Sequence, residues 1–103
     1  DYLVMRAPRP TLICAATRDF FDIGGAWTSF RDAKRVYGRL GFAERVDLFE
    51  TDAPHSYDRP AREASTRFML RWLAGRDEAV TEPTLIPLAD ADLYAAPHGQ
   101  VLK

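Results

Sequence analysis

The fold is decided by residues 11–55, which begin with the segment TLICAATRDFFDIGG (residues 11–25). Residues 11–16 form a short apolar run without alternation, which predicts a strand buried on both faces. An acid, Asp19, follows this run, and a histidine, His55, follows a second apolar run one helix later. Parallel strands of an open α/β sheet end at the same edge, where ligands bind, so we expect these two side chains to lie close together.

Two amphipathic helices are predicted around the second strand. The first helix follows Gly24-Gly25 and is stopped by Gly41. Its apolar stripe consists of Ala26, Phe30, Ala33, Tyr37 and Leu40, widened by Trp27 and Val36. Residues 44–50 alternate between apolar and polar, which predicts a strand near the sheet edge. Pro60 suits the first turn of a second helix, which ends at Gly75. The strand-helix-strand order predicts a right-handed parallel crossover.

The ordered domain is expected to occupy residues 1–75. Residues 2–5 fit either the tail of a helix or a buried loop, and the sequence leaves both alternatives open. Residues 76–103 contain three prolines and only scattered apolar residues, which is typical of a tail or interdomain linker. At most a short turn is expected there, at residues 89–94.

Composition narrows the class of protein. The chain has 103 residues, 47% of them hydrophobic, which predicts at most one small globular domain. The net charge is −1 and no basic block is present, which argues against nucleic acid as the main partner. No apolar run approaches the roughly 18 residues that a membrane helix needs. The single cysteine, Cys14, excludes an internal disulfide and is expected to be a small buried side chain.

The predicted sheet is incomplete on its own. A two-stranded parallel sheet cannot bury both its faces and both its edges. Residues 11–16 are the most apolar stretch and require a strand on either side, yet this chain supplies at most one neighbour. We therefore expect further strands from an upstream segment of the same protein or from a swapped copy.

The acid and the histidine suggest acid-base chemistry. A carboxylate at Asp19 is placed to accept the Nδ1–H of a histidine and fix its tautomer, and His55 is placed to act as a general base. Asp22 is the competing acid, and we assign it to capping of the following helix. His98 lies in the Pro-rich tail and is assigned no role. An acid followed by a histidine at successive strand ends matches the order of a Ser…Asp…His triad.

The nucleophile of such a triad is missing. No Gly-x-Ser-x-Gly elbow occurs in the chain, and Ser56 is excluded because adjacent side chains diverge. No ligand spacing predicts a metal, and no motif predicts a cofactor. Phe20, Phe21 and Trp27 are candidates to line an acyl or sugar pocket, although at least one of them is expected in the core.

These motifs resemble part of the α/β-hydrolase fold. Residues 16–19 (ATRD) resemble the family's Gly-x-x-Asp loop, with Ala16 in place of glycine. Residues 53–57 (APHSY) resemble the family's catalytic-histidine turn. The likeness covers residues 8–75 and implies an α/β fold, the C-terminal strand-helix-strand-helix portion of a parallel-sheet hydrolase. Together with Gly25-Ala26-Trp27, it is most similar to the acetyl-xylan-esterase and dienelactone-hydrolase-like group.

The resemblance implies a serine ester hydrolase with Asp19 and His55 as catalytic residues. The serine and the oxyanion hole would lie upstream, so the chain alone is predicted to be inactive. The implied substrates are carbohydrate acetates or other small acyl esters. No cofactor is expected, and neither nucleic acid nor a membrane is expected as a partner. Residues 92–101 are similar to a segment that follows the hydrolase domain in multidomain members. Two alternatives remain: a non-catalytic binding domain of this fold, or a peptidase of the prolyl-oligopeptidase type.

Overall fold

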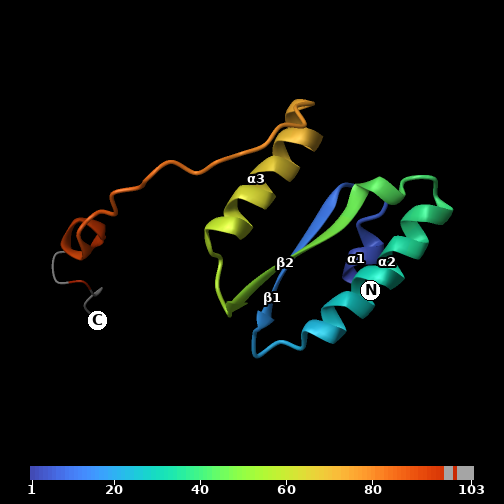
Figure 1. Ribbon diagram of the computed structural model, residues 1–103, viewed down its shortest axis with the longest axis horizontal. Coiled ribbons are helices and arrows are strands. Elements are labelled where there is room, and N and C mark those ends of the chain that lie inside the picture. The colour runs from blue at the N-terminus through green and yellow to red at the C-terminus, as the bar shows by residue number, and fades with distance from the viewer. Residues whose placement is uncertain (97–98, 100–103) are drawn as a thin grey trace.

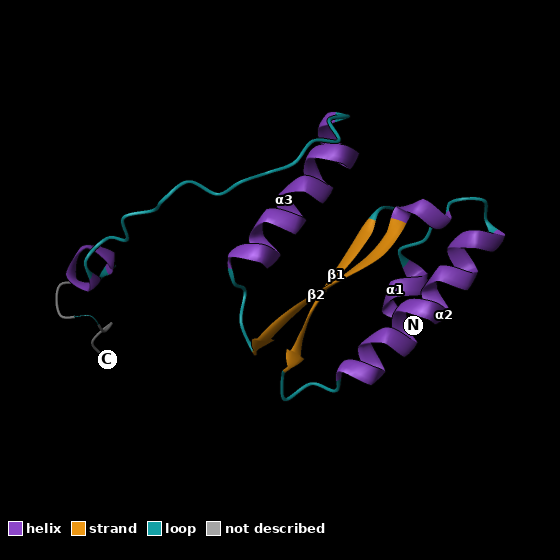
Figure 2. Ribbon diagram, viewed as in Figure 1, coloured by secondary structure: helices purple, strands orange, loops and turns teal. Residues whose placement is uncertain are grey.

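Two parallel strands form the centre of the structure, and a long helix packs on either side of them (Figures 1 and 2). The computed structural model describes residues 1–96 and 99. In chain order the elements are α1 (Tyr2–Met5), β1 (Thr11–Arg18), α2 (Ile23–Arg39), the 3₁₀ helix η1 (Ala43–Arg45), β2 (Val46–Pro54), α3 (Arg59–Ala74) and the 3₁₀ helix η2 (Asp90–Leu93). The predicted α/β class is therefore confirmed.

The strand pairing confirms the parallel arrangement and corrects the length of β2. Thr11 pairs with Val46, and the register continues without a break to the pair Ala16 and Thr51. After an irregularity, Arg18 pairs with Pro54. The second strand was predicted to end at residue 50, but its pairing with β1 carries it four residues further. The carboxyl ends of both strands thus lie at the same end of the sheet, and the loops to α2 and α3 leave from there (Figure 2).

The helix α2 begins earlier than predicted. Its first residue is Ile23, and the Gly24-Gly25 pair lies inside the first turn rather than before it. The Asp22 carboxylate accepts the Gly24 and Gly25 amides at 3.1 and 2.8 Å. This cap satisfies amides that a helix start leaves without partners, which offsets the low helix propensity of glycine. The predicted capping role of Asp22 is confirmed.

Glycines end both long helices, as predicted. Gly41 has φ +87° and Gly75 has φ +67°, in the left-handed region that favours glycine. Beyond them, the Phe42 amide donates to the Tyr37 carbonyl at 2.8 Å. The Arg76 amide likewise donates to the carbonyl of Leu70 at 3.1 Å. Each bond satisfies a carbonyl of the last helical turn and turns the chain away.

The short helices α1 and η2 lie outside the sheet. Residues 2–5 form the helix α1, which packs against α2, so they are not a buried loop. The 3₁₀ helix at residues 90–93 falls within the short turn predicted for the tail. The segment between α3 and η2 has no helix or strand, and it leads away from the sheet (Figure 1).

The core lies between α2 and the sheet. Ala33, Tyr37 and Val46 are fully buried, and Phe30 packs against them. Leu40, predicted in the same stripe, is 52% exposed because α2 ends one residue before it. That part of the stripe prediction is wrong.

The strand β1 is less buried than its apolar sequence predicts. Only Thr11 and Ala16 of this strand are buried, and Cys14 is exposed. The prediction of burial on both faces, and of a buried Cys14, is therefore wrong for the part of the chain that the structure describes. The physical reason is that β1 pairs only with β2 there, so no strand covers its other edge.

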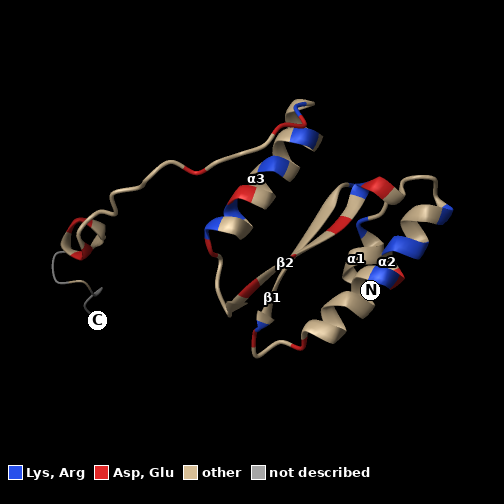
Figure 3. Ribbon diagram, viewed as in Figure 1, with Lys and Arg blue, Asp and Glu red and all other residues tan. Residues whose placement is uncertain are grey.

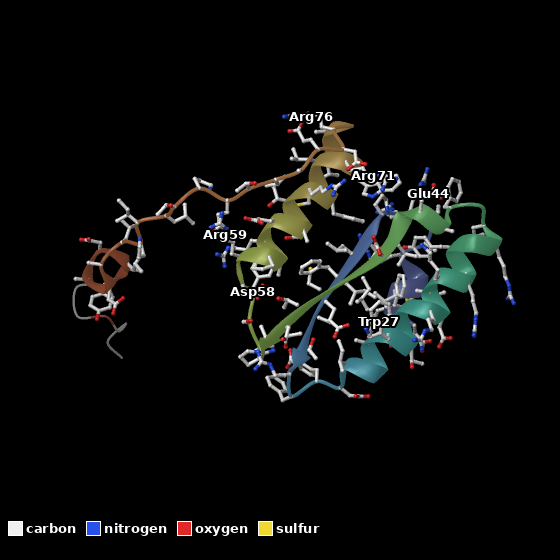
Figure 4. All side chains as sticks on the ribbon, viewed as in Figure 1. Trp27, Glu44, Asp58, Arg59, Arg71 and Arg76 are labelled. Atoms are coloured by element: carbon white, nitrogen blue, oxygen red, sulfur yellow. The ribbon has the colours of Figure 1, made fainter. Side chains whose placement is uncertain are left out.

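Adjacent residues of β2 bind opposite helices. On one face, Glu50 accepts the Trp27 indole N–H of α2 at 2.7 Å and the Thr17 hydroxyl of β1 at 2.7 Å. On the other face, the Thr51 hydroxyl donates to Asp58 at 2.7 Å. Figure 4 shows Trp27 and Asp58 on opposite sides of the strands. The Asp58 carboxylate also accepts the Ala61 amide at 3.1 Å and so caps α3.

A buried tyrosine joins α2 to the entry of β1. The Tyr37 hydroxyl donates to the Arg9 carbonyl at 2.7 Å and lies 3.1 Å from the Thr11 hydroxyl. The Thr11 hydroxyl in turn accepts a hydrogen bond from Nε of Arg6 at 2.9 Å. The Tyr37 hydroxyl lies inside the core, where a polar group needs a hydrogen-bond partner.

Tyr37→Phe is expected to lower the free energy of unfolding by about 1 kcal/mol, because the Tyr37 hydroxyl no longer donates to the Arg9 carbonyl, which keeps the Thr11 hydroxyl as a donor at 3.1 Å. Urea denaturation measures the change. Tyr2→Phe is the matched control, since Tyr2 is 86% exposed, and it is expected to leave stability unchanged. Equal stability of Tyr37→Phe and the wild type would contradict the assigned role of this hydroxyl.

Candidate active site

The structure brings Asp19 and His55 together. Asp19 directly follows the last residue of β1, and His55 directly follows the last residue of β2. The Nδ1 atom of His55 lies 2.9 Å from Oδ2 and 3.1 Å from Oδ1 of Asp19. Asp22 instead caps α2, as described above, and His98 lies outside the described residues. Asp19 and His55, which were expected to lie close together, are thus the acid and the histidine that meet.

The Asp19 carboxylate is held from two sides. Its side chain is only 12% exposed, and Oδ1 also accepts the Phe21 amide at 3.1 Å. Partial desolvation acts to raise the pKa of Asp19, but hydrogen bonds from His55 and Phe21 and the charge of His55 outweigh it. The pKa of Asp19 therefore lies below its ordinary value, and the carboxylate is ionised at neutral pH.

His55 is open on its other side. Its side chain is 59% exposed, and within residues 1–96 and 99 no hydrogen bond engages Nε2. With Nδ1–H donated to Asp19, the neutral ring carries its lone pair on Nε2. The arrangement can accept a proton at Nε2 and stabilise the resulting imidazolium.

Two phenylalanines flank the imidazole. The ring centroids of Phe20 and Phe21 lie 4.6 and 6.0 Å from that of His55, and both side chains are largely exposed. They are available to line a binding surface beside the histidine. Trp27 is not, because its indole N–H is bonded to Glu50 between α2 and β2.

A hollow of about 340 Å³ lies beside the pair, along the open side of β1. It is lined by Ile13, Cys14, Ala15, Ala16, Asp19, Phe21, Asp22, Ile23, Ala26, His55 and Ser56. Its walls are mainly apolar away from the acid and the histidine. An acyl group or an apolar side chain from another segment fits such a lining.

The turn that carries His55 is fixed at several points. Arg18 of β1 bonds both the carboxylate and the carbonyl of Asp52, at 3.2 and 3.0 Å. The Tyr57 hydroxyl is hydrogen-bonded to Ser65, a buried residue of α3. The Arg62 guanidinium donates to the Tyr57 carbonyl at 2.7 Å. The turn that carries His55 is therefore bound to α3, and the end of β2 that leads into it is bound to β1.

Ser56 does not belong to the pair despite its position. Its hydroxyl donates back to the Pro54 carbonyl at 2.9 Å, which closes a local turn. This agrees with its exclusion as a nucleophile. Among the described residues, no group of three histidine, cysteine or acidic side chains is placed to hold a metal ion.

Sequence reasoning missed the residues that brace the site. The Asp-x-Pro pattern at residues 58–60 is a helix-start signal from which the cap at Asp58 was predictable. The contact between Glu50 and Trp27, and that between Arg62 and Tyr57, depend on strand register and helix rotation. No local signal predicts such contacts.

A scan against protein-family models, a search of curated proteins and a search of solved structures each returned no match. No helix among residues 1–96 and 99 is long and apolar enough to cross a lipid bilayer.

His55→Ala is expected to raise the pKa of Asp19, because the hydrogen bond and charge that lower it are lost while desolvation remains. Carboxyl ¹³C NMR titration measures the shift, with Ser56→Ala as the control that leaves it unchanged. An unaltered Asp19 pKa in His55→Ala would contradict the pairing.

The sign of the linked stability change follows from the same shift. The folded pKa lies below the unfolded one, so Asp19 contributes stability above its unfolded pKa and loses it as the pH falls through the folded pKa. His55→Ala is expected to weaken this acid-side dependence of the free energy of unfolding.

Proposed function

We propose that this chain supplies the acid and the histidine of a Ser-Asp-His triad in a serine ester hydrolase of the α/β-hydrolase fold. The observation that carries the proposal is the 2.9 Å contact between His55 Nδ1 and Asp19 Oδ2, made by residues that follow two consecutive parallel strands. The partly exposed histidine and the shielded acid are the burial pattern that a triad requires.

In the proposed reaction, His55 Nε2 takes the proton of a serine hydroxyl as the serine oxygen bonds to the ester carbonyl carbon. Asp19 holds the Nδ1–H tautomer and stabilises the imidazolium. The imidazolium then gives its Nε2 proton to the leaving alcohol oxygen as the carbon–oxygen ester bond breaks. Water repeats the sequence, with His55 as the base, and releases the acid.

The serine and the oxyanion hole are proposed to lie on a segment outside this chain. The open edge of β1 and the apolar hollow beside the pair support a neighbouring strand there, from an upstream segment or a swapped copy. The proposed substrates are acetyl or other small acyl esters, including those of carbohydrates. That substrate class rests on the likeness at residues 25–27 and on the mainly apolar hollow.

In the full-length protein, His55→Ala is expected to lower kcat for p-nitrophenyl acetate by several orders of magnitude, about 10⁴-fold or more. Asp19→Asn is expected to lower kcat by about 10⁴-fold, because the histidine then loses its fixed tautomer. Ser29→Ala is the control and should retain activity, because this exposed serine of α2 lies neither in the hollow nor in the turn that carries His55.

A panel of esters and peptides separates the alternatives. Hydrolysis of p-nitrophenyl acetate and acetylated xylan, but not of proline-containing peptides, would support the ester hydrolase. Cleavage of the peptides alone would replace it with a peptidase. Full activity in His55→Ala, or no hydrolysis of any substrate by the wild type, would overturn the triad.

The open edge generates a separate prediction. If another strand pairs with β1 in the full-length protein, Cys14 is expected to react with iodoacetamide at least about a hundredfold more slowly in the native protein than in urea, because burial shields the thiol. The rates are compared at a pH where the thiol is ionised in both states.

A cysteine placed in the tail by Ala91→Cys, in a Cys14→Ser background, is the control and should react quickly in the native protein. Equal reaction rates of Cys14 in the native and unfolded protein would show that no segment covers this edge.

A further inference from the structure

The segment that follows α3 returns to the start of that helix and is fixed there by Glu82. Both oxygens of the Glu82 carboxylate accept from Arg62, at 2.7 and 2.8 Å. The Glu82 carbonyl accepts from Arg59 at 2.6 Å, and the Glu82 amide donates to Glu63 at 2.9 Å. The Glu82 side chain is only 17% exposed, which is low for an acid in a tail.

The same arginine reaches the turn that carries His55. While Nε and Nη2 of Arg62 bind Glu82, Nη1 donates to the Tyr57 carbonyl at 2.7 Å. A guanidinium is planar and rigid, so a bidentate carboxylate that fixes its plane also fixes the position of Nη1. A continuous set of hydrogen bonds thus runs from the tail to a backbone atom two residues from His55.

Charge supports this contact. Figure 3 shows basic residues recurring along α3, over which the tail segment runs. The hydrogen bonds and charge of Glu82 raise the pKa of Arg62 against partial desolvation, and the hydrogen bonds from Arg62 lower the pKa of Glu82. The pair is therefore charged at neutral pH, which favours the short bidentate geometry.

We infer that Glu82 is a positioning residue for the Asp19–His55 pair, acting through Arg62 on the Tyr57 carbonyl. The docked tail restricts the backbone after His55 and so keeps the imidazole aligned with Asp19. The catalytic consequence of this inference rests on the proposed function. Its structural consequence, a fixed His55 ring, does not.

A second ion pair between α3 and the tail provides the control. Arg67 contacts Asp77 at 3.1 Å, but neither side chain has a contact with the His55 turn among the hydrogen bonds of the described residues. Breaking this pair loosens the tail at another point and leaves Arg62 and Tyr57 bonded. A general effect of tail attachment and a specific effect of Glu82 are thereby separated.

The test compares Glu82→Gln and Arg62→Lys with Asp77→Asn in the full-length protein. Glutamine removes the charge and one acceptor, and lysine cannot bind two carboxylate oxygens and a carbonyl with a fixed fork. Imidazole ¹⁵N NMR reports the fraction of His55 with its proton on Nδ1, and kinetics with p-nitrophenyl acetate report kcat and KM separately. Circular dichroism and thermal unfolding confirm that each variant is folded.

Glu82→Gln and Arg62→Lys are expected to lower the Nδ1–H fraction of His55 and to lower kcat by about tenfold or more with little change in KM, because small displacements at a reacting group are costly. Asp77→Asn is expected to change neither. An unchanged His55 NMR signature in both Glu82→Gln and Arg62→Lys, or an equal change in Asp77→Asn, would overturn the inference.

The two proposals fail in different ways. If His55→Ala retains activity, the triad is wrong, yet the NMR comparison still decides whether Glu82 positions the histidine. If the triad variants are inactive while Glu82→Gln resembles the wild type in both measurements, only the role of Glu82 is wrong.

Discussion

Parallel pairing of β1 with β2 sets the distance between the acid and the histidine. Arg18 and Pro54 are register partners at the ends of the two strands, and Asp19 and His55 are the next residue on each. Backbone pairing of the strands therefore brings these two residues side by side at the strand ends without relying on a side-chain contact. The helices α2 and α3 then run back from these strand ends on opposite sides of the two strands, and each helix begins at an aspartate cap, Asp22 or Asp58 (Figure 2).

The parts of this structure that follow from local rules could be predicted from the sequence. An uninterrupted apolar run, a 3.6-residue spacing and glycines with positive φ each act over a few residues, so both strands and both long helices were expected in the right order. The meeting of Asp19 with His55 was predictable for the same reason, since parallel topology alone brings successive strand ends together.

Other features depend on distant parts of the chain. The start of α2 was predicted too late, because the low helix propensity of Gly24-Gly25 suggested a loop. In the structure the Asp22 carboxylate accepts hydrogen bonds from both glycine amides, and the helix begins before them. The continuation of β2 to Pro54 depends on a partner in β1. The docking of Glu82 joins residues 20 positions apart, where spacing carries no signal. Burial of Cys14 was overestimated because it depends on a strand that the described residues do not supply.

The two neighbouring side chains Glu50 and Thr51 have a consequence for how the strands find their alignment. Side chains alternate along a strand, so a slip of one residue would turn Glu50 toward α3 and Thr51 toward α2. The carboxylate would lose the Trp27 indole, and the hydroxyl would lose the Asp58 cap. A shifted register thus breaks one polar contact on each face of the sheet, so the side chains of Glu50 and Thr51 together favour the correct alignment of the strands.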